Sequence, residues 1–403
     1  MDSGNIAWLL TAAALVAFMT PGLAFFYGGM VRSKNVLGML MQNVFAMGLI
    51  SVIWVTIGFS LAFGGEGSLI GNLDYAFGYD IAEQGGEFMA FFAFQMMFAV
   101  ITPALITGAT ADRLKFSSYA LFIGIWTILV YSPVAHWVWG AGGWLFEGKW
   151  LLNGEVQDFA GGAAIHINAG IAALVVVAVI GSRRGHGSEA MPPHNLPQTV
   201  LGTGILWFGW FGFNAGSALA ADATAAQALV NTHLAAAAGM LGWLAVERVK
   251  TGHPTVLGAC TGAVAGLVAI TPCAGFVGDY SPVIIGLIAG AGCYLALQVK
   301  EVLRLDDSLD VIAVHLVGGL IGTLLLGFFG DSAINGRDGL FYGGGIELFV
   351  DQLIGAVAVI VFSGVVTYVI AVAIDRTIGL RVDPEAELVG LDQSQHAESA
   401  YQA

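Results

Sequence analysis

Charged residues are scarce in this chain of 403 residues. Only 10% of them are Asp, Glu, Lys or Arg, whereas a soluble globular protein carries about 25%. A soluble domain of this length cannot cover its surface with so few charged side chains, and 57% of the residues are hydrophobic. Disordered chains need low hydrophobicity, so the same composition excludes extensive disorder. The sequence therefore predicts a polytopic membrane protein.

Basic residues, cysteines and catalytic motifs are scarce as well. The net charge is −14 and no basic run extends beyond Arg183-Arg184, which argues against nucleic-acid binding. Cys260, Cys273 and Cys293 lie in apolar stretches, so neither a disulfide framework nor a CxxC metal site is indicated. The chain lacks a GxxxxGK[ST] loop and a GxSxG elbow. We therefore expect neither ATP hydrolysis by that loop nor Ser/His/Asp catalysis.

Long apolar stretches dominate the sequence. A helix that spans a bilayer needs roughly 20 mostly apolar residues, because backbone polar groups cannot stay unpaired in hydrocarbon. Eleven stretches free of Asp, Glu, Lys and Arg meet this need, at about 6–31, 37–63, 88–110, 116–139, 159–181, 198–220, 225–246, 255–277, 282–299, 311–330 and 352–374. The sequence thus predicts an all-α membrane protein with eleven transmembrane helices.

Lys and Arg occur mainly in alternate loops. If the loops after every odd-numbered span face the cytoplasm, they hold twelve of the fourteen basic residues, and only Lys149 and Arg337 lie elsewhere. Cytoplasmic loops carry such an excess, so we expect the N-terminus outside and the C-terminus inside. Ten or twelve spans would mix the basic and acidic loops. The start, Met1-Asp2-Ser3-Gly4-Asn5, has no basic region, so we expect no cleavable signal peptide.

A short internal repeat surrounds two histidines. Asp158 precedes His166 by eight residues, as Asp307 precedes His315, and the two segments align without gaps. A unit of five helices is odd, so its second copy enters the membrane from the opposite side, and such repeats place substrate sites near the midplane. The expected organisation is a membrane transport domain at 1–375 with inverted halves at about 1–185 and 195–330 and an eleventh helix at about 352–374, followed by a cytoplasmic tail at 376–403.

The two histidines should lie within the membrane. His166 and His315 stand about eight and five residues into their spans, at ~1.5 Å of rise per residue. Each alone reads most simply as a neutral histidine hydrogen-bonded in a helix interface. Intramembrane ionisable groups are costly and usually mark a pathway, so two at repeat-equivalent positions favour a pathway. Without nearby cysteines or further embedded carboxylates, they do not form a metal-ligand set.

Two carboxylates and several aromatic side chains each allow two interpretations. Asp158 and Asp310 either cap the helices that follow them or stabilise a cation at a pore mouth. Trp139 is typical of an interfacial aromatic belt. The segments 95–98 and 210–217 fit either helix packing or the lining of a cavity. A Trp and a Phe that face one cavity, with a hydroxyl beside them, would suit a small cation.

These segments resemble the ammonium transporter/methylammonium permease/Rhesus family, and in particular its bacterial ammonium-transporter branch. The resemblance covers essentially the whole chain. The matching segments are Asp158-Phe-Ala-Gly-Gly with His166-Ile-Asn-Ala, Gly209-Trp-Phe-Gly-Phe213-Asn-Ala-Gly-Ser217, and Asp306-Asp-Ser-Leu-Asp310 with His315. The resemblance implies a homotrimer in the cell membrane, with one pore through each subunit and with ammonium, ammonia and methylammonium as substrates.

The resemblance also implies a role for each candidate residue. It implies an ammonium recruitment site of Trp139, Phe98 and Ser217, a gate of Phe98 and Phe213, a pore lined by His166, His315 and Trp210, and functional carboxylates at Asp158 and Asp310. The C-terminal tail is similar to tails that communicate with PII-type nitrogen-signalling proteins. We expect no cofactor and no metal.

We hypothesise that the ion sheds its proton near the gate and crosses as ammonia, because an apolar pore penalises any bare ion. A sensor that signals through the tail without flux is the alternative. A channel for neutral gases or water is disfavoured by the aromatic and acidic outer mouth. An enzyme is disfavoured because the sequence offers no plausible nucleophile–base pair or metal set.

Overall fold

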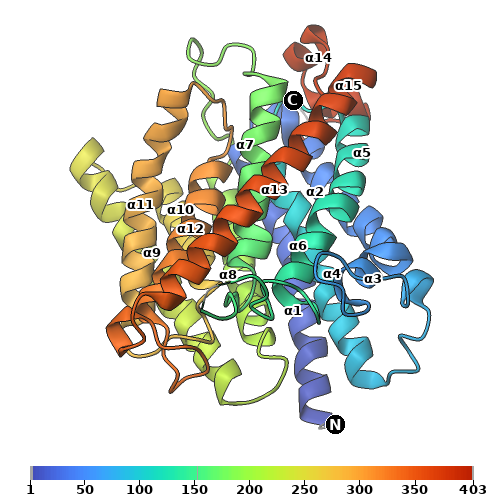
Figure 1. The fold of residues 1–403 in the computed structure, drawn as a ribbon. Helices are drawn as coiled ribbons and strands as arrows, with labels where there is room; N and C mark the ends of the chain where they lie inside the picture. The colour runs from blue at the N-terminus through green and yellow to red at the C-terminus, as the bar shows by residue number, and fades with distance from the viewer. Residues whose placement is uncertain (1–2, 152, 402–403) are drawn as a thin grey trace.

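The computed structural model describes residues 3–151 and 153–401, and every named element of regular secondary structure in these ranges is a helix. A single isolated backbone bridge, between Leu114 and Arg381, is the only β-type pairing in the described chain. Residues 1, 2, 402 and 403 belong to the predicted first loop and tail but lie outside the described residues. Figure 1 shows a bundle of long, tilted helices with the two termini at opposite ends.

Nine helical segments of the described chain are long and apolar enough to cross a membrane. They are α1 (Ser3–Met30), η1 to α3 (Ser33–Phe63), α4 (Gly86–Ile106), α5 to α6 (Phe116–Trp139), η5 to α7 (Gly162–Ile180), α9 (Ala223–Thr251), α11 (Ser281–Leu303), η6 to α12 (Ile312–Phe329) and α13 (Glu347–Thr377). Each lies on one of the eleven expected spans.

The other two expected spans are also helical. The stretch at 255–277 forms α10 (Val256–Ile270), which has only 15 residues. The stretch at 198–220 forms α8 (Leu196–Gly216), which is long enough but contains Trp, Gln and Asn residues that lower its mean hydropathy. The number eleven and the direction of the chain across the bilayer stay predictions.

Four of the expected spans contain a turn of π-helix, which the sequence did not predict. The turns are η2 (Trp54–Gly58), η4 (Thr127–Tyr131), η5 (Gly162–Ile167) and η6 (Ile312–Val317). The spans are therefore continuous helices whose period changes locally. π-Helical turns are rare and are frequently found at functional sites. Two of these turns carry His166 and His315.

Close helix contacts depend on glycine at two places that matter here. Along the extensive contact of α1 with α8, a Cβ at Gly202 would lie 2.2 Å from the backbone nitrogen of Phe26. Between α7 (Asn168–Ile180) and η6, a Cβ at Gly170 would lie 2.4 Å from the backbone nitrogen of Leu316. Small residues let membrane helices approach this closely, so Gly170 brings the helices of the two histidines together.

The C-terminal segment folds back onto one end of the helical bundle, where it contacts the start of α2 (Val36–Ile53). It contains the short helices α14 (Pro384–Val389) and α15 (Leu391–His396). The backbone nitrogen of Gly38, in the first turn of α2, donates to Asp392 at 2.8 Å. The guanidinium of Arg381 pairs with Glu387, also at 2.8 Å. The tail is therefore an ordered layer on one end of the bundle (Figure 1).

Candidate functional site

A cavity of about 320 Å³ opens between the helices at one end of the bundle. We call this cavity the vestibule; its lining includes Gln95, Phe98, Trp139, Asp158, Ser217 and Asn335. It lies at the end of the bundle where the N-terminus lies. Asn5 shows this, because its side chain accepts a hydrogen bond from the backbone nitrogen of Ala221, just beyond Ser217. Residues from α4, α6 (Ser132–Trp139), the end of α8 and two loops therefore meet at one cavity.

Phe98 and Phe213 close the floor of the vestibule. Their rings are stacked, with centroids 4.2 Å apart and planes at 20°, and both side chains are buried. The Trp139 ring meets Phe98 edge-on at a centroid distance of 6.1 Å. The stacked pair separates the vestibule, which Phe98 lines, from a second cavity, which Phe213 lines.

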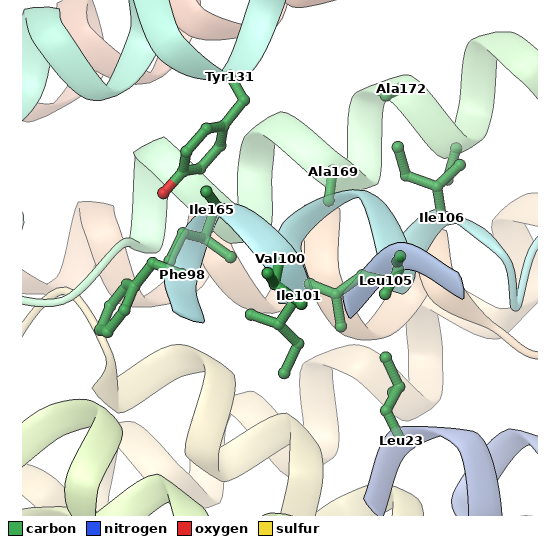
Figure 2. Packing of buried hydrophobic residues seen from close by; sticks show 14 of the residues in the cluster. Leu23, Phe98, Val100, Ile101, Leu105, Ile106, Tyr131, Ile165, Ala169 and Ala172 are labelled. Carbon is green, nitrogen blue, oxygen red and sulfur yellow. The ribbon is translucent and has the colours of Figure 1, made fainter. Parts of the chain in front are cut away.

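The second cavity, which we call the lumen, is narrow and mostly apolar. Its volume is about 20 Å³, and a single water molecule needs roughly 10–15 Å³ on this scale. Its lining includes His166 and His315 together with Trp210 and aliphatic side chains. Figure 2 shows Phe98, Ile101 and Leu105 following one another along α4, with Ile165 and Leu23 nearby. The lumen therefore offers space for about one water-sized molecule at a time.

The two histidines lie side by side in the lumen. Their Nδ1 atoms are 3.2 Å apart and their rings are nearly parallel, with centroids separated by 5.2 Å. The Trp210 ring stacks on His166 at 5.5 Å, and its indole N–H donates to Thr271. Nε2 of His166 has no hydrogen-bond partner in the described part of the chain. This nitrogen is therefore available to a small polar molecule.

Asp158 holds the start of the helix that carries His166. Its two carboxylate oxygens accept four backbone N–H groups, from residues 161 to 164, at 2.6 to 3.0 Å. Its backbone carbonyl accepts the indole N–H of Trp139 at 2.8 Å. Burial raises the pKa of the Asp158 carboxyl, and the four N–H groups oppose that shift. Asp158 thus combines the expected capping role with a position in the vestibule wall.

Asp307 occupies the corresponding position in the second half, where the sequence pointed to Asp310. The Asp307 carboxylate accepts the backbone N–H groups of Val311 and Ile312, at 3.1 and 2.7 Å, ahead of His315. Asp310 instead pairs with Lys300. The capping interpretation of Asp310 was therefore wrong. The signal was present, because Asp307 and Asp158 both stand eight residues before their histidines.

Asp307 lies just before its membrane-spanning segment, and several charged side chains surround it. Burial and the charge of Asp310 raise the pKa of Asp307 to about 7. Burial alone would also raise the pKa of Asp306, but Arg183 and Arg113 bring it down to about 2. Arg113 donates to the carbonyl of Asp306 and to the hydroxyl of Ser308, so it holds the segment that leads to Asp307.

Known proteins resemble this chain along almost its whole length. The sequence model described as Ammonium Transporter Family matches residues 7–401. A curated ammonium transporter of Mycobacterium tuberculosis is 49% identical over 431 residues, which cover 99% of this chain and 90% of that protein.

Solved structures agree with the sequence matches. The crystal structure of Candida albicans Mep2 is similar with a TM-score of 0.89 and 34% identity, covering 100% of this chain and 91% of that one. A structure titled Sensor Amt Protein has the same TM-score at 31% identity, with 98% of both chains covered. With nine helices able to span a bilayer in the described residues, these matches identify a multi-pass membrane protein.

Proposed function

Because the chain belongs to the Ammonium Transporter Family, we propose that it binds the ammonium ion in the vestibule and conducts ammonia through the lumen. One observation carries the proposal. A wide aromatic cavity and a narrow lumen with two adjacent histidines are separated by a single stacked pair of phenylalanines.

The vestibule suits a small cation. Trp139 and Phe98 offer aromatic rings, and cation–π attraction contributes up to about 2 kcal/mol where water is excluded. The hydroxyl of Ser217 donates to the backbone carbonyl of Phe213 at 2.9 Å, which leaves its oxygen free to accept an N–H of the ion. These contacts support the proposal that Trp139, Phe98 and Ser217 recruit ammonium.

The lumen selects solutes that lose their charge. Desolvation disfavours the charged form of any acid, so an ammonium ion that reaches the Phe98/Phe213 gate releases its proton more readily than it does in water. A potassium ion has no proton to release and meets the full cost of desolvation, several kcal/mol or more. Ammonia then passes His166 and His315, whose ring nitrogens accept and donate hydrogen bonds and can relay the proton.

The experiment is flux in reconstituted vesicles, with methylammonium uptake and current recorded together and potassium as the competing ion. We expect His166→Ala and His315→Ala either to abolish methylammonium uptake or to admit potassium. His233→Ala is the matched control, because His233 lies on the exposed face of α9 and lines neither cavity. Unchanged uptake with unchanged selectivity in both pore variants would refute the assignment.

A sensor is the second candidate function. It is favoured by the likeness to the structure titled Sensor Amt Protein and by the ordered tail. A sensor would bind ammonium in the same vestibule, and its tail would change without meaningful flux, so the vesicle experiment separates the two. Assembly as a homotrimer and binding of a PII-type protein at the tail follow from the resemblance alone and stay predictions.

A further inference from the structure

One buried polar side chain of the vestibule has no assigned role. Gln95 lies on α4, three residues before Phe98, and its side chain lines the vestibule. The residue is only 7% exposed. Its carboxamide oxygen has no hydrogen-bond partner among residues 3–151 and 153–401. A buried polar group without a partner costs roughly 1–3 kcal/mol. The oxygen is shielded from the vestibule in this orientation, so it gains a bond from a ligand only when the carboxamide turns it toward the cavity.

The acceptors around Gln95 are largely in use. Both carboxylate oxygens of Asp158 accept backbone N–H groups, and its carbonyl accepts the indole of Trp139. Ser217 keeps a free lone pair, since its proton is donated to Phe213. The oxygen and nitrogen of a carboxamide exchange places by a half-turn about one bond, so Gln95 can present its oxygen to the cavity.

We propose that Gln95 is a specificity-determining residue, whose carboxamide oxygen accepts one N–H of the ammonium ion in the vestibule. The inference rests on the proposed function. An ammonium ion has four N–H groups, and the Phe98 ring, the Trp139 ring, the Ser217 hydroxyl and Gln95 provide one partner for each.

Methylammonium has three N–H groups and one methyl group. In every orientation the methyl group takes the place of one of the four contacts, so the site prefers ammonium. A site that hydrogen-bonds an N–H rejects the analogue that lacks it. If Gln95 becomes apolar, methylammonium can turn its methyl group toward the new side chain and keep its three other contacts, while ammonium loses one. The preference for ammonium then disappears.

The test is Gln95→Met, assayed by radiolabelled methylammonium uptake with unlabelled ammonium as competitor. One data set gives the KM for methylammonium and the inhibition constant for ammonium. We expect the KM for methylammonium divided by the inhibition constant for ammonium to fall roughly tenfold, because the inhibition constant for ammonium rises while the KM for methylammonium stays nearly the same. Potassium exclusion should be unchanged, because it arises in the lumen. An unchanged ratio in a transporting variant overturns the inference and leaves the proposed function intact.

Gln42→Met is the matched control. Gln42 lies on α2, is also buried with a carboxamide oxygen that lacks a partner in the described chain, and lines neither cavity. Its substitution should leave the ratio as in the wild type. A similar fall in both variants would overturn the inference.

A second variant covers the case in which Gln95→Met does not fold. Gln95→Glu keeps the shape and the acceptor, so the preference for ammonium should persist or increase. Equal weakening of both substrates by Gln95→Glu overturns the inference. If the wild type itself takes up neither ammonium nor methylammonium, the proposed function fails first, so the two failures are distinguishable.

Discussion

Replacement of Asp158 by Asn tests how the helix of His166 is held. Asn keeps one carbonyl oxygen, so two of the four N–H groups now bound by the carboxylate lose their acceptor. Each buried donor left without a partner costs roughly 1–3 kcal/mol. The unfolding free energy should therefore fall by roughly 2–6 kcal/mol, and transport should be lost with the geometry of the helix start.

The control is Asp222→Asn. Asp222 caps α9 through a single bond from its carboxylate to the backbone nitrogen of Ala225, and the residue is exposed. Asn and Asp are about equally good caps at such a position, so the unfolding free energy should change by only a few tenths of a kcal/mol. The two variants differ in burial and in the number of bonds, while the chemical change is the same.

The assay is denaturant-induced unfolding in detergent, followed by tryptophan fluorescence, with methylammonium uptake measured on the same preparations. Equal stability of the Asp158→Asn and Asp222→Asn variants would refute the bond-counting argument. If Asp158→Asn is stable but inactive, the carboxylate acts on the permeating ion through its charge.

Two further predictions concern the second half of the site and the contact between the halves. With a pKa of about 7 when folded and 3.8 when unfolded, Asp307 should make the unfolding free energy fall by on the order of 4 kcal/mol as the pH rises from 4 to 7.5. Asp307→Asn should remove this decrease, and parallel pH profiles of the two proteins would contradict it. Gly170→Ala should destabilise by roughly 1–3 kcal/mol, since the added carbon meets the backbone of Leu316. Gly204→Ala, where a Cβ meets open space, should not destabilise the protein in the same thermal unfolding assay.

The spans were largely predictable because hydrocarbon imposes one simple rule on sequence. A run of apolar residues long enough to cross must be helical, and all eleven predicted stretches contain helix. The π-helical turns were not predictable, because they arise where packed side chains force a local change of period. Nothing in the residues of Gly162–Ile167 distinguishes that turn from an ordinary α-helical one.

The site residues were predictable as types, while their partners were not. Trp139, Phe98 and Ser217 stand in three distant segments, and only the fold shows that they line one cavity. The Nδ1–Nδ1 contact of His166 and His315 likewise depends on how α7 and η6 pack. Asp310 was given the capping interpretation although the repeat aligned Asp307 with Asp158. The equal spacing to the histidines identified Asp307, but the pairing of Asp310 with Lys300 depends on the fold.

The π-helical turns of η5 and η6 set a limit on how the length of this chain can vary. Each turn holds one residue more than an α-helix would need over the same height. Deleting one residue there would restore the α-helical period and leave the flanking segments in phase. Residues inside the turn would shift by one position, about 100° around the helix axis, so His166 or His315 would no longer face its counterpart. Insertions and deletions should accumulate in the surface loops of homologous chains and be excluded from these two turns.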